Sequence, residues 1–209
     1  QPRGAISLQN LDREYAFTES DERLLQTLAS SLAVALENAR LFKAEQERNA
    51  ELAIINSVQA ALAAELNIQG IYDAVGDKIR EIFNQSDMGI RIYDPEENLL
   101  YFPYSYENGQ RNGIGQSMPM PEKGFSAHVF RTREMLVIHE NMAQEMEKYG
   151  SFLIPGSEME KSAVYVPLVS GDRTRGLISL SDMNREHAFS DSDIRLLQTL
   201  ANSMSVALE

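Results

Sequence analysis

Cysteine is absent from the 209 residues of this chain. Its absence excludes disulfides, thiolate metal sites and a chromophore linked through cysteine, and it favours a reducing compartment, so we expect a cytoplasmic location. No apolar run approaches the roughly 20 residues that a membrane-spanning helix needs, so we expect no membrane contact in this segment. The first four residues resemble neither a signal peptide nor a start at methionine, which indicates a piece of a longer protein.

Basic residues are scarce relative to acidic ones. The chain has 19 Lys and Arg against 31 Asp and Glu, which gives a formal net charge of -12. Because this charge repels polyanions, we expect no nucleic-acid partner. The hydrophobic fraction of 43% supports a packed core, and the length suits one full domain with an appendage.

Known catalytic motifs are also missing. The sequence has no nucleophile elbow and no zincin motif, and the glycines at 109, 113 and 115 are not followed by a helix that opens with lysine, as a phosphate loop would require. The three histidines, His128, His139 and His187, lack the spacing of metal ligands. We therefore expect no enzyme activity, no metal site and no cofactor.

An internal repeat organises the chain. Residues 4–8, GAISL, are echoed by residues 176–180, GLISL, an offset of 176 − 4 = 172, and the match continues without a gap to the end of the sequence with about two-thirds identity. Because this period has the size of a domain, the two copies are read as two domain endings. Residues 1–40 are then the closing strand and helix of a preceding domain, and residues 67–209 form a complete domain.

Each copy has the pattern of a strand, a turn and a helix. Ile178 and Leu180 alternate with serines, as in a half-buried strand. Ser190 lies three residues before Asp193, the spacing of a helix-capping box. Apolar residues then recur at helical spacing: Leu196, Leu197, Leu200, Met204 and Leu208.

Residues 19–65 contain neither proline nor glycine, so one long helix is expected there, with residues 41–66 as a connecting helix or coiled coil. Two explanations of its apolar stripe remain open: a seam in a parallel homodimer, which carries register shifts between domains, or a face that packs on the domain's own sheet. The stripe changes phase near Asn49 and comprises Leu25, Leu28, Leu32, Ala35, Ala39, Phe42, Leu52, Ile55, Val58 and Leu62.

The remaining sequence predicts an α+β domain. A helix follows Asn67 and ends near Asn84. A hairpin of strands at 88–92 and 99–106 comes next, followed by a loop over 107–123. Helices at 124–132 and 141–149 flank a strand at 135–138, and strands at 162–169 and 175–181 precede the last helix. This order indicates an antiparallel sheet of about six strands.

The segments AVYVPL (163–168) and GLISL (176–180), followed by Asn184, Arg185, Phe189 and Asp193, resemble the ending of GAF domains. Residues 124–138, GFSAHVFRTREMLVI, resemble that family's internal helix and strand. The resemblance implies a PAS-like fold, with terminal helices on one face of the sheet and short helices over a ligand pocket on the other.

The resemblance also implies a function. GAF domains of this kind are sensory modules, found in tandem in bacterial multi-domain signalling proteins and joined by helices to an output domain such as the histidine kinase of a two-component system or a nucleotide cyclase. We therefore expect an unknown small-molecule ligand and a covalently linked output domain. The alternative is a ligand-free domain for dimerisation and signal transmission.

The nucleotide-binding branch of the family carries an Asn-Lys, Phe, Asp-Glu signature that this sequence matches only in part. Asn184 and Phe189 fit, whereas Arg185 replaces the lysine and Ile194 stands in place of the glutamate. An ion pair between Arg185 and Asp193 would preserve the architecture of the signature. The match therefore gives little support for a cyclic nucleotide.

Strand alternation identifies the candidate ligand site. If Met88, Ile90 and Ile92 face the terminal helices, Arg91 and Tyr93 face the opposite side, which lines the cavity in the family. A guanidinium there requires an anionic partner, either a ligand or a protein acid. Tyr101, Tyr104, Phe125, Phe152 and Tyr165 form an aromatic wall or simply part of the core. With His128, whose helix lies over the pocket in related domains, the candidate ligand-binding residues are Arg91, Tyr93, Tyr101, Phe125, His128 and Tyr165.

Overall fold

The computed structural model describes residues 4–65, 67–84, 87–112, 115–153 and 158–208. The chain divides into two units, Gln1–Ala53 and Ile54–Glu209. Along the chain the elements are α1 (Glu19–Ala64), α2 (Ile68–Ile82), β1 (Asp87–Asp94), β2 (Leu99–Glu107), β3 (Gln110–Arg111), β4 (Ser117–Pro119), α3 (Phe125–Thr132), β5 (Leu136–Ile138), α4 (Met142–Tyr149), β6 (Ser162–Ser170), β7 (Arg173–Asp182) and α5 (Asp191–Ala207).

The first unit consists of residues 4–18, which have no regular secondary structure, and most of α1. Residues 4–8, read as the closing strand of a preceding domain whose sheet is not in this chain, form no strand in the described residues. A strand needs neighbours for its backbone hydrogen bonds, and the repeat contains no second copy of the strands that flank β7. The long helix is confirmed, and in this unit most of its apolar side chains are exposed, with Leu28 at 54% and Leu32 at 49%.

The second unit is built on an antiparallel sheet in the order β3-β2-β1-β7-β6-β5, with β4 also paired to β2. The α+β class and the antiparallel sheet are confirmed. The described residues form seven strands, against about six expected: the five at the predicted ranges, and β3 and β4, which lie in the segment expected to be a loop. Strands of two and three residues are too short to show an alternating pattern.

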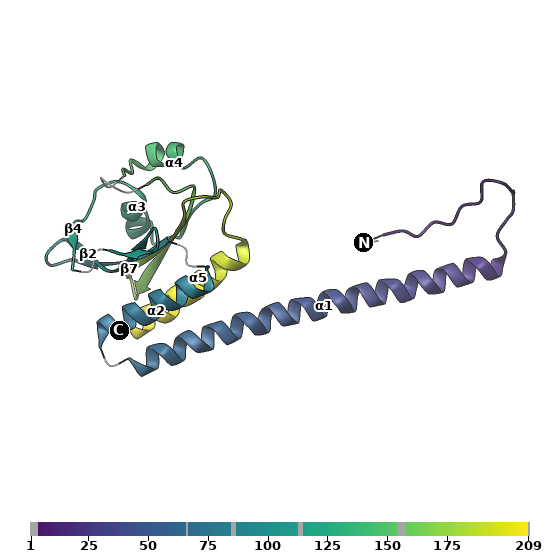
Figure 1. Ribbon diagram of the computed structural model, residues 1–209, viewed down its shortest axis with the longest axis horizontal. Helices are drawn as coiled ribbons and strands as arrows, with labels where there is room; N and C mark the ends of the chain where they lie inside the picture. Colours follow the sequence, from purple (N-terminus) through teal and green to yellow (C-terminus); the bar gives the residue numbers. More distant parts are fainter. Residues whose placement is uncertain (1–3, 66, 85–86, 113–114, 154–157, 209) are drawn as a thin grey trace. The chain divides into compact units, whose positions relative to one another are not determined.

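One face of the sheet carries the main hydrophobic core. Helices α2 and α5 lie side by side against this face (Figure 1), and Val58 and Leu62 from the last turns of α1 are buried with them. Met88 and Ile90 point into this core at 3% and 0% exposure, as the alternation in β1 predicts. Burying each such side chain contributes about 1.5–3 kcal/mol to folding.

The other face carries a smaller core beneath α3 and α4, which Figure 1 shows on the side of the sheet opposite α2 and α5. Its buried residues are Phe125, Val129, Leu136, Ile138, Met142, Ala163, Tyr165 and Leu177. The sheet is thus a wall between two apolar layers. A strand such as β1 presents alternate side chains to each layer.

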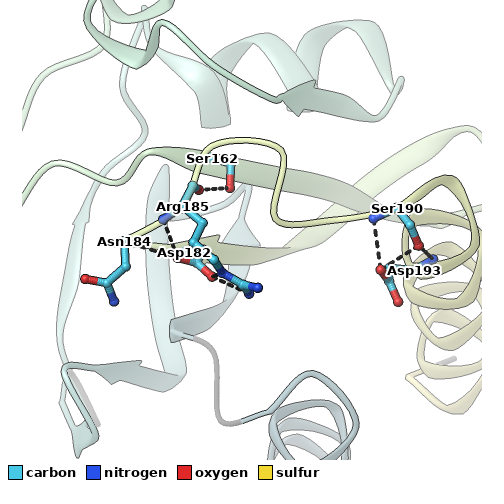
Figure 2. A network of polar contacts seen from close by, with 6 residues as sticks. All are labelled: Ser162, Asp182, Asn184, Arg185, Ser190 and Asp193. Carbon is cyan, nitrogen blue, oxygen red and sulfur yellow. Dashed lines mark hydrogen bonds and ion pairs between the residues drawn. The ribbon is translucent and has the colours of Figure 1, made fainter.

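Two separate groups of polar contacts lie at the end of β7 and at the start of α5 (Figure 2). Asp182 accepts hydrogen bonds from the backbone N–H groups of Asn184 and Arg185, and its carboxylate lies 2.8 Å from the Arg185 guanidinium. Asp193 accepts from Ser190 N and Oγ at 2.9 and 2.6 Å and so caps α5. The expected pair between Arg185 and Asp193 therefore does not form, because each side chain is held by a nearer partner.

Candidate functional site

A cavity of about 620 Å³ lies on the face of the sheet that carries α3. Strands β1, β2 and β7 contribute its floor, and the start of α3 and residues 116–123 and 151–160 contribute lining residues around it where the structure describes them. This volume falls within the range of about 300–1,000 Å³ that is usual for small-molecule sites.

Small side chains make the floor of the cavity. Gly89 in β1 lies opposite Ser105 in β2 and Ser179 in β7, and Asp87 lies opposite Ser181. A Cβ added to Gly89 would lie 3.2 Å from Ser179 Oγ, so the absence of a side chain at Gly89 leaves space for the Ser179 hydroxyl. The floor therefore combines open space with hydroxyl groups that can donate or accept hydrogen bonds.

Arg91 places a positively charged side chain in this cavity. Its Nη1 donates to Ser126 Oγ at 2.6 Å, and the guanidinium carbon lies 5.9 Å from the ring centroids of both Phe102 and Tyr165. Within the described ranges no carboxylate pairs with this half-buried side chain. A guanidinium has five N–H donors, so most of its capacity remains for a ligand.

The first turn of α3 adds to this positive end. Gly124 stands at the N-cap with φ 103°, no side chain caps the helix there, and Gly124, Phe125 and Ser126 all line the cavity. The first N–H groups of a helix lack partners within the helix and favour anions. Lys123 also lines the cavity. Arg91 and the start of α3 meet at Ser126, where an anion would have donors on two sides.

Acidic side chains also line the cavity: Asp87, Glu107, Glu158 and Glu160. Burial raises the pKa of the Asp87 carboxyl, and the Asn108 N–H, 3.0 Å from its Oδ1, and the charge of Arg80 only partly offset this effect. Burial, and then the nearby Glu160, raise the pKa of Tyr165, whose hydroxyl donates to Glu160 Oε1 at 2.9 Å. Tyr165 is therefore a neutral donor at physiological pH.

The structure brings three of the six candidate residues together. Arg91, Phe125 and Tyr165 line the cavity, and the rings of Phe125 and Tyr165 are 5.4 Å apart. Phe152, from the expected aromatic wall, also lines it, although its side chain is 60% exposed.

The other three candidates lie outside the cavity lining. Tyr93 donates to Asn98 Oδ1 and packs edge-on against Phe130, and Tyr101 donates to Glu97. Tyr93 thus keeps the α3 face that alternation in β1 predicts, but it lies beyond the cavity. The pairing of β1 with β2 shifts register between Ile90 and Ile92, and Tyr101 pairs with Ile92, whose side chain packs against the helix-facing core. His128 packs on Tyr149, because it lies two residues, or about 200° of helical rotation, beyond Ser126.

Tyr104 belongs to the opposite face from the expected wall. It is fully buried in the helix-facing core, and its hydroxyl donates to Asp77 Oδ1 at 2.7 Å. Sequence reasoning missed the floor serines and Ser126, because serine has no motif of its own. The alternation in β7, which turns Ser179 and Ser181 away from the helices, was the signal that was available.

Two of the histidines meet in space. His139 and His187 stack with their ring centroids 5.4 Å apart, and His187 Nε2 lies 3.1 Å from Glu140 Oε2. Among the residues that the structure describes, no group of three or more His, Asp or Glu side chains is placed to hold a metal ion. Within that part of the chain, no helix is long and apolar enough to cross a membrane.

Helices on one face of an antiparallel sheet and a cavity on the other form the arrangement that the resemblance to GAF domains implies. The family model described as "GAF domain" matches residues 65–209, and the chain belongs to this family. It therefore contains a regulatory sensor domain. Formate hydrogenlyase transcriptional activator FhlA of Escherichia coli (strain K12) is 21% identical over 159 residues, which cover 75% of this chain and 23% of that protein. The chain thus spans about a quarter of this relative's length.

Solved structures share the fold. The GAF domain from Acinetobacter phosphoenolpyruvate-protein phosphotransferase superposes with a TM-score of 0.66 at 17% identity, over 77% of this chain and 93% of that one. Free methionine-R-sulfoxide reductase from Neisseria meningitidis, solved with its substrate, has a TM-score of 0.60 at 16% identity, over 75% and 87%. The same fold therefore occurs in a GAF domain of a phosphotransferase and in an enzyme of another class.

Proposed function

We propose that the cavity binds a small anionic molecule, of the carboxylate or oxyanion class, and that binding is signalled to an output domain. The observation that carries this proposal is Arg91, a half-buried guanidinium that lines the cavity with only Ser126 as a hydrogen-bond partner in the described residues. The uncapped start of α3 and Lys123 add positive potential at the same end.

Strand β1 supplies the route for the signal. Arg91 faces the cavity, and its neighbour Ile90 is buried in the core against the terminal helices. A ligand that pulls Arg91 towards Ser126 therefore shifts a strand that also supports the helices, and a ligand acts only to the extent that it binds one arrangement better than another.

The proposal includes a covalently linked output domain. A histidine kinase or nucleotide cyclase is the output that the sequence resemblance implies. The relatives add a transcriptional activator and a phosphotransferase as proteins that carry such a region. The module itself is proposed to be regulatory, and turnover of a substrate by the isolated chain would contradict that part.

A cytoplasmic homodimer completes the proposal. The lack of cysteine supports the compartment. Contact between two α1 helices is supported by exposed apolar side chains that neither unit covers in the described residues, including Val34 at 60%, Leu41 at 54% and Phe42 at 62%.

The direct test is native mass spectrometry of freshly purified protein, combined with thermal melts in a panel of small anions that includes formate, acetate, succinate and phosphate. We expect a retained small molecule, or a melting temperature that rises with the concentration of one anion, because a ligand stabilises the state that binds it. No retained mass and no shift with any anion would favour the ligand-free transmission domain.

A further inference from the structure

The first unit repeats the local structure of the domain's C-terminal segment, although it lacks a sheet. Asn10 Oδ1 accepts from the N–H groups of Asp12 and Arg13 at 2.9 and 3.0 Å, as Asp182 Oδ1 accepts from the equivalent positions 184 and 185 at 2.8 Å each. Tyr15 and its equivalent His187 both have positive φ, 55° and 51°. The turn that leads from strand to helix in the domain is thus present in both copies.

The helices also begin in the same way. Thr18 N donates to Asp21 Oδ2 at 2.8 Å and Asp21 N donates to Thr18 Oγ1 at 3.3 Å, and the corresponding distances for Ser190 and Asp193 are 2.9 and 3.3 Å. Both caps satisfy helix N–H groups from within the segment. The start of α1 is therefore built as a second α5.

The domain shows which face of such a helix is buried. The buried residues of α5 are Ile194, Leu196, Leu197, Leu200, Ala201, Met204 and Ser205. At the offset of 172, the equivalents in α1 are Glu22, Leu24, Leu25, Leu28, Ala29, Leu32 and Ala33. Six of the seven are apolar, whereas the equivalents of the exposed Arg195, Gln198 and Asn202 are Arg23, Gln26 and Ser30.

Residues 4–8 of the first copy also have the sequence of a strand that pairs with a neighbouring strand, although no such neighbour contacts them in the described residues. Gly176 in β7 is required where it stands, because an added Cβ would lie 2.4 Å from the carbonyl oxygen of Arg91 in β1. Its equivalent Gly4 has nothing within 4 Å of an added Cβ. Ile6 and Leu8 are 43% and 55% exposed, whereas their equivalents Ile178 and Leu180 are 0% and 1% exposed.

We infer that Leu24, Leu25, Leu28, Ala29 and Leu32 form a docking face for the sheet of another GAF domain, and that residues 4–8 add a strand to that sheet. A second copy of this chain does not fit as the occupant, because its sheet is already covered: Ile178 and Leu180 are buried under its own helices. The inference is independent of the ligand in the cavity. It also removes Leu25, Leu28 and Leu32 from the homodimer seam and leaves Phe42 and its neighbours for contact between copies.

A chimera tests whether the first copy can close a sheet. Residues 176–208 of the full chain are replaced by residues 4–36, with Leu177 and Ile194 kept because the first copy has Ala5 and Glu22 there. The expected result is cooperative thermal unfolding, monitored by circular dichroism, within about 10 °C of the parent, since the other changed buried positions, Met204 and Ser205, become leucine and alanine. A chimera without a cooperative transition would overturn the inference.

Two matched variants of the chimera locate the face. Leu200→Asp changes a position that is fully buried in α5, and Gln198→Asp changes an exposed one; both residues are shared by the two copies. The first is expected to abolish the transition and the second to leave it within about 2 °C. Equal effects of the two variants would contradict the assigned face.

A second experiment, on point variants of the original chain, tests whether a second copy of this chain occupies the docking face instead. Leu28→Asp is compared with Phe42→Asp by light scattering at micromolar concentration. We expect the Leu28→Asp protein to have the same mass in solution as the parent, because the docking face that contains Leu28 binds the sheet of another GAF domain and not a second copy of this chain. Loss of a parental dimer in Leu28→Asp would assign the face to a contact between copies and overturn the inference.

Discussion

Gly76 in α2 shows how one residue fixes the packing of a helix on the sheet. A Cβ at this position would lie 2.4 Å from Cζ of Tyr104. The ring cannot easily move, because its hydroxyl is bound to Asp77 and the Arg111 guanidinium lies 5.0 Å from its centroid. Glycine within a helix costs about 1 kcal/mol relative to alanine, so the close contact explains why glycine occurs here.

Gly76→Ala is expected to lower the free energy of unfolding by about 1–2 kcal/mol, because the clash exceeds the gain in helix propensity. Gly70→Ala in the same helix is the matched control. Its Cβ would clash only with the end of the flexible Glu65 side chain and would lie at an ordinary 3.5 Å from Asn67 Nδ2, so this variant is expected to be neutral or stabilising. Urea denaturation of both proteins measures the difference, and equal stabilisation would show that the ring yields.

Two neighbouring carboxyls at the end of the sheet should respond to pH with opposite signs. Burial raises the pKa of Asp87, so its ionised form opposes folding. For Asp182, burial acts in the same direction, but hydrogen bonds from Asn184 and Arg185 and the charge of Arg185 outweigh it and lower the pKa.

Asp87→Asn is therefore expected to raise the melting temperature at pH 7.5, with the gain disappearing as the pH falls through the raised pKa to below 3.8, the ordinary value. Asp182→Asn is expected to lower it at pH 7.5, with the loss disappearing as the pH falls below the depressed pKa. Thermal melts between pH 3 and 8 test both variants. Differences that do not vary with pH would exclude titration of these groups as the cause.

At the scale of elements, local sequence determines where the helices begin. Tertiary contacts determine how much each helix start contributes to the free energy of unfolding. The same capping box begins α1 and α5. Helix α5 then buries seven residues, six of them in the hydrophobic core, whereas the part of α1 in the first unit buries none among the described residues.

Ser190→Ala is expected to lower the unfolding free energy of the domain by about 1 kcal/mol, the usual loss for a helix cap. Thr18→Ala removes the same cap from α1 and is expected to leave the main thermal transition unchanged, since the first turns of that helix pack on no core in the described residues. Differential scanning calorimetry compares the two. A similar loss in both would mean that the start of α1 unfolds together with the domain.

The sequence predicted secondary-structure elements wherever the segment was long enough to show a helical or strand-like spacing of apolar residues. The long helix, α2, α5 and the two hairpins were predicted close to their observed bounds, and the alternation in β1 placed Arg91 on the cavity face. The short strands β3 and β4 lack a readable period. The same alternation placed Tyr93 on that face, where it packs on Phe130 of α3 outside the cavity lining. Tyr101 was assigned only as part of an aromatic wall, and no sequence pattern fixed its face. The serines of the cavity floor become visible only when three strands are set side by side.

For the whole molecule, the boundary of the folded unit depends on α1. The domain was expected to begin at residue 67, yet Val58 and Leu62 are buried in its core at 1% and 9% exposure. These two side chains cover the apolar surface that the core presents towards α1.

A truncated chain of residues 54–209 is therefore expected to unfold at the temperature of the parent. A chain of residues 67–209 is expected to be less stable by about 3–5 kcal/mol, because it loses two buried aliphatic side chains. Circular dichroism melts of the two truncations make the comparison. Equal stability would show that the end of α1 adds nothing to the domain.

The central claim, that the cavity senses an anion through Arg91, is tested most directly by thermal melts of Arg91→Ala in the anion that stabilises the parent. At a hundredfold excess over the dissociation constant, the parent is expected to gain about 2.7 kcal/mol, or roughly 5–10 °C. Arg91→Ala should keep the unliganded melting temperature within a few degrees and lose the shift, whereas Arg131→Ala, exposed on α3 and outside the cavity lining, should retain it. A full shift in Arg91→Ala would contradict the account.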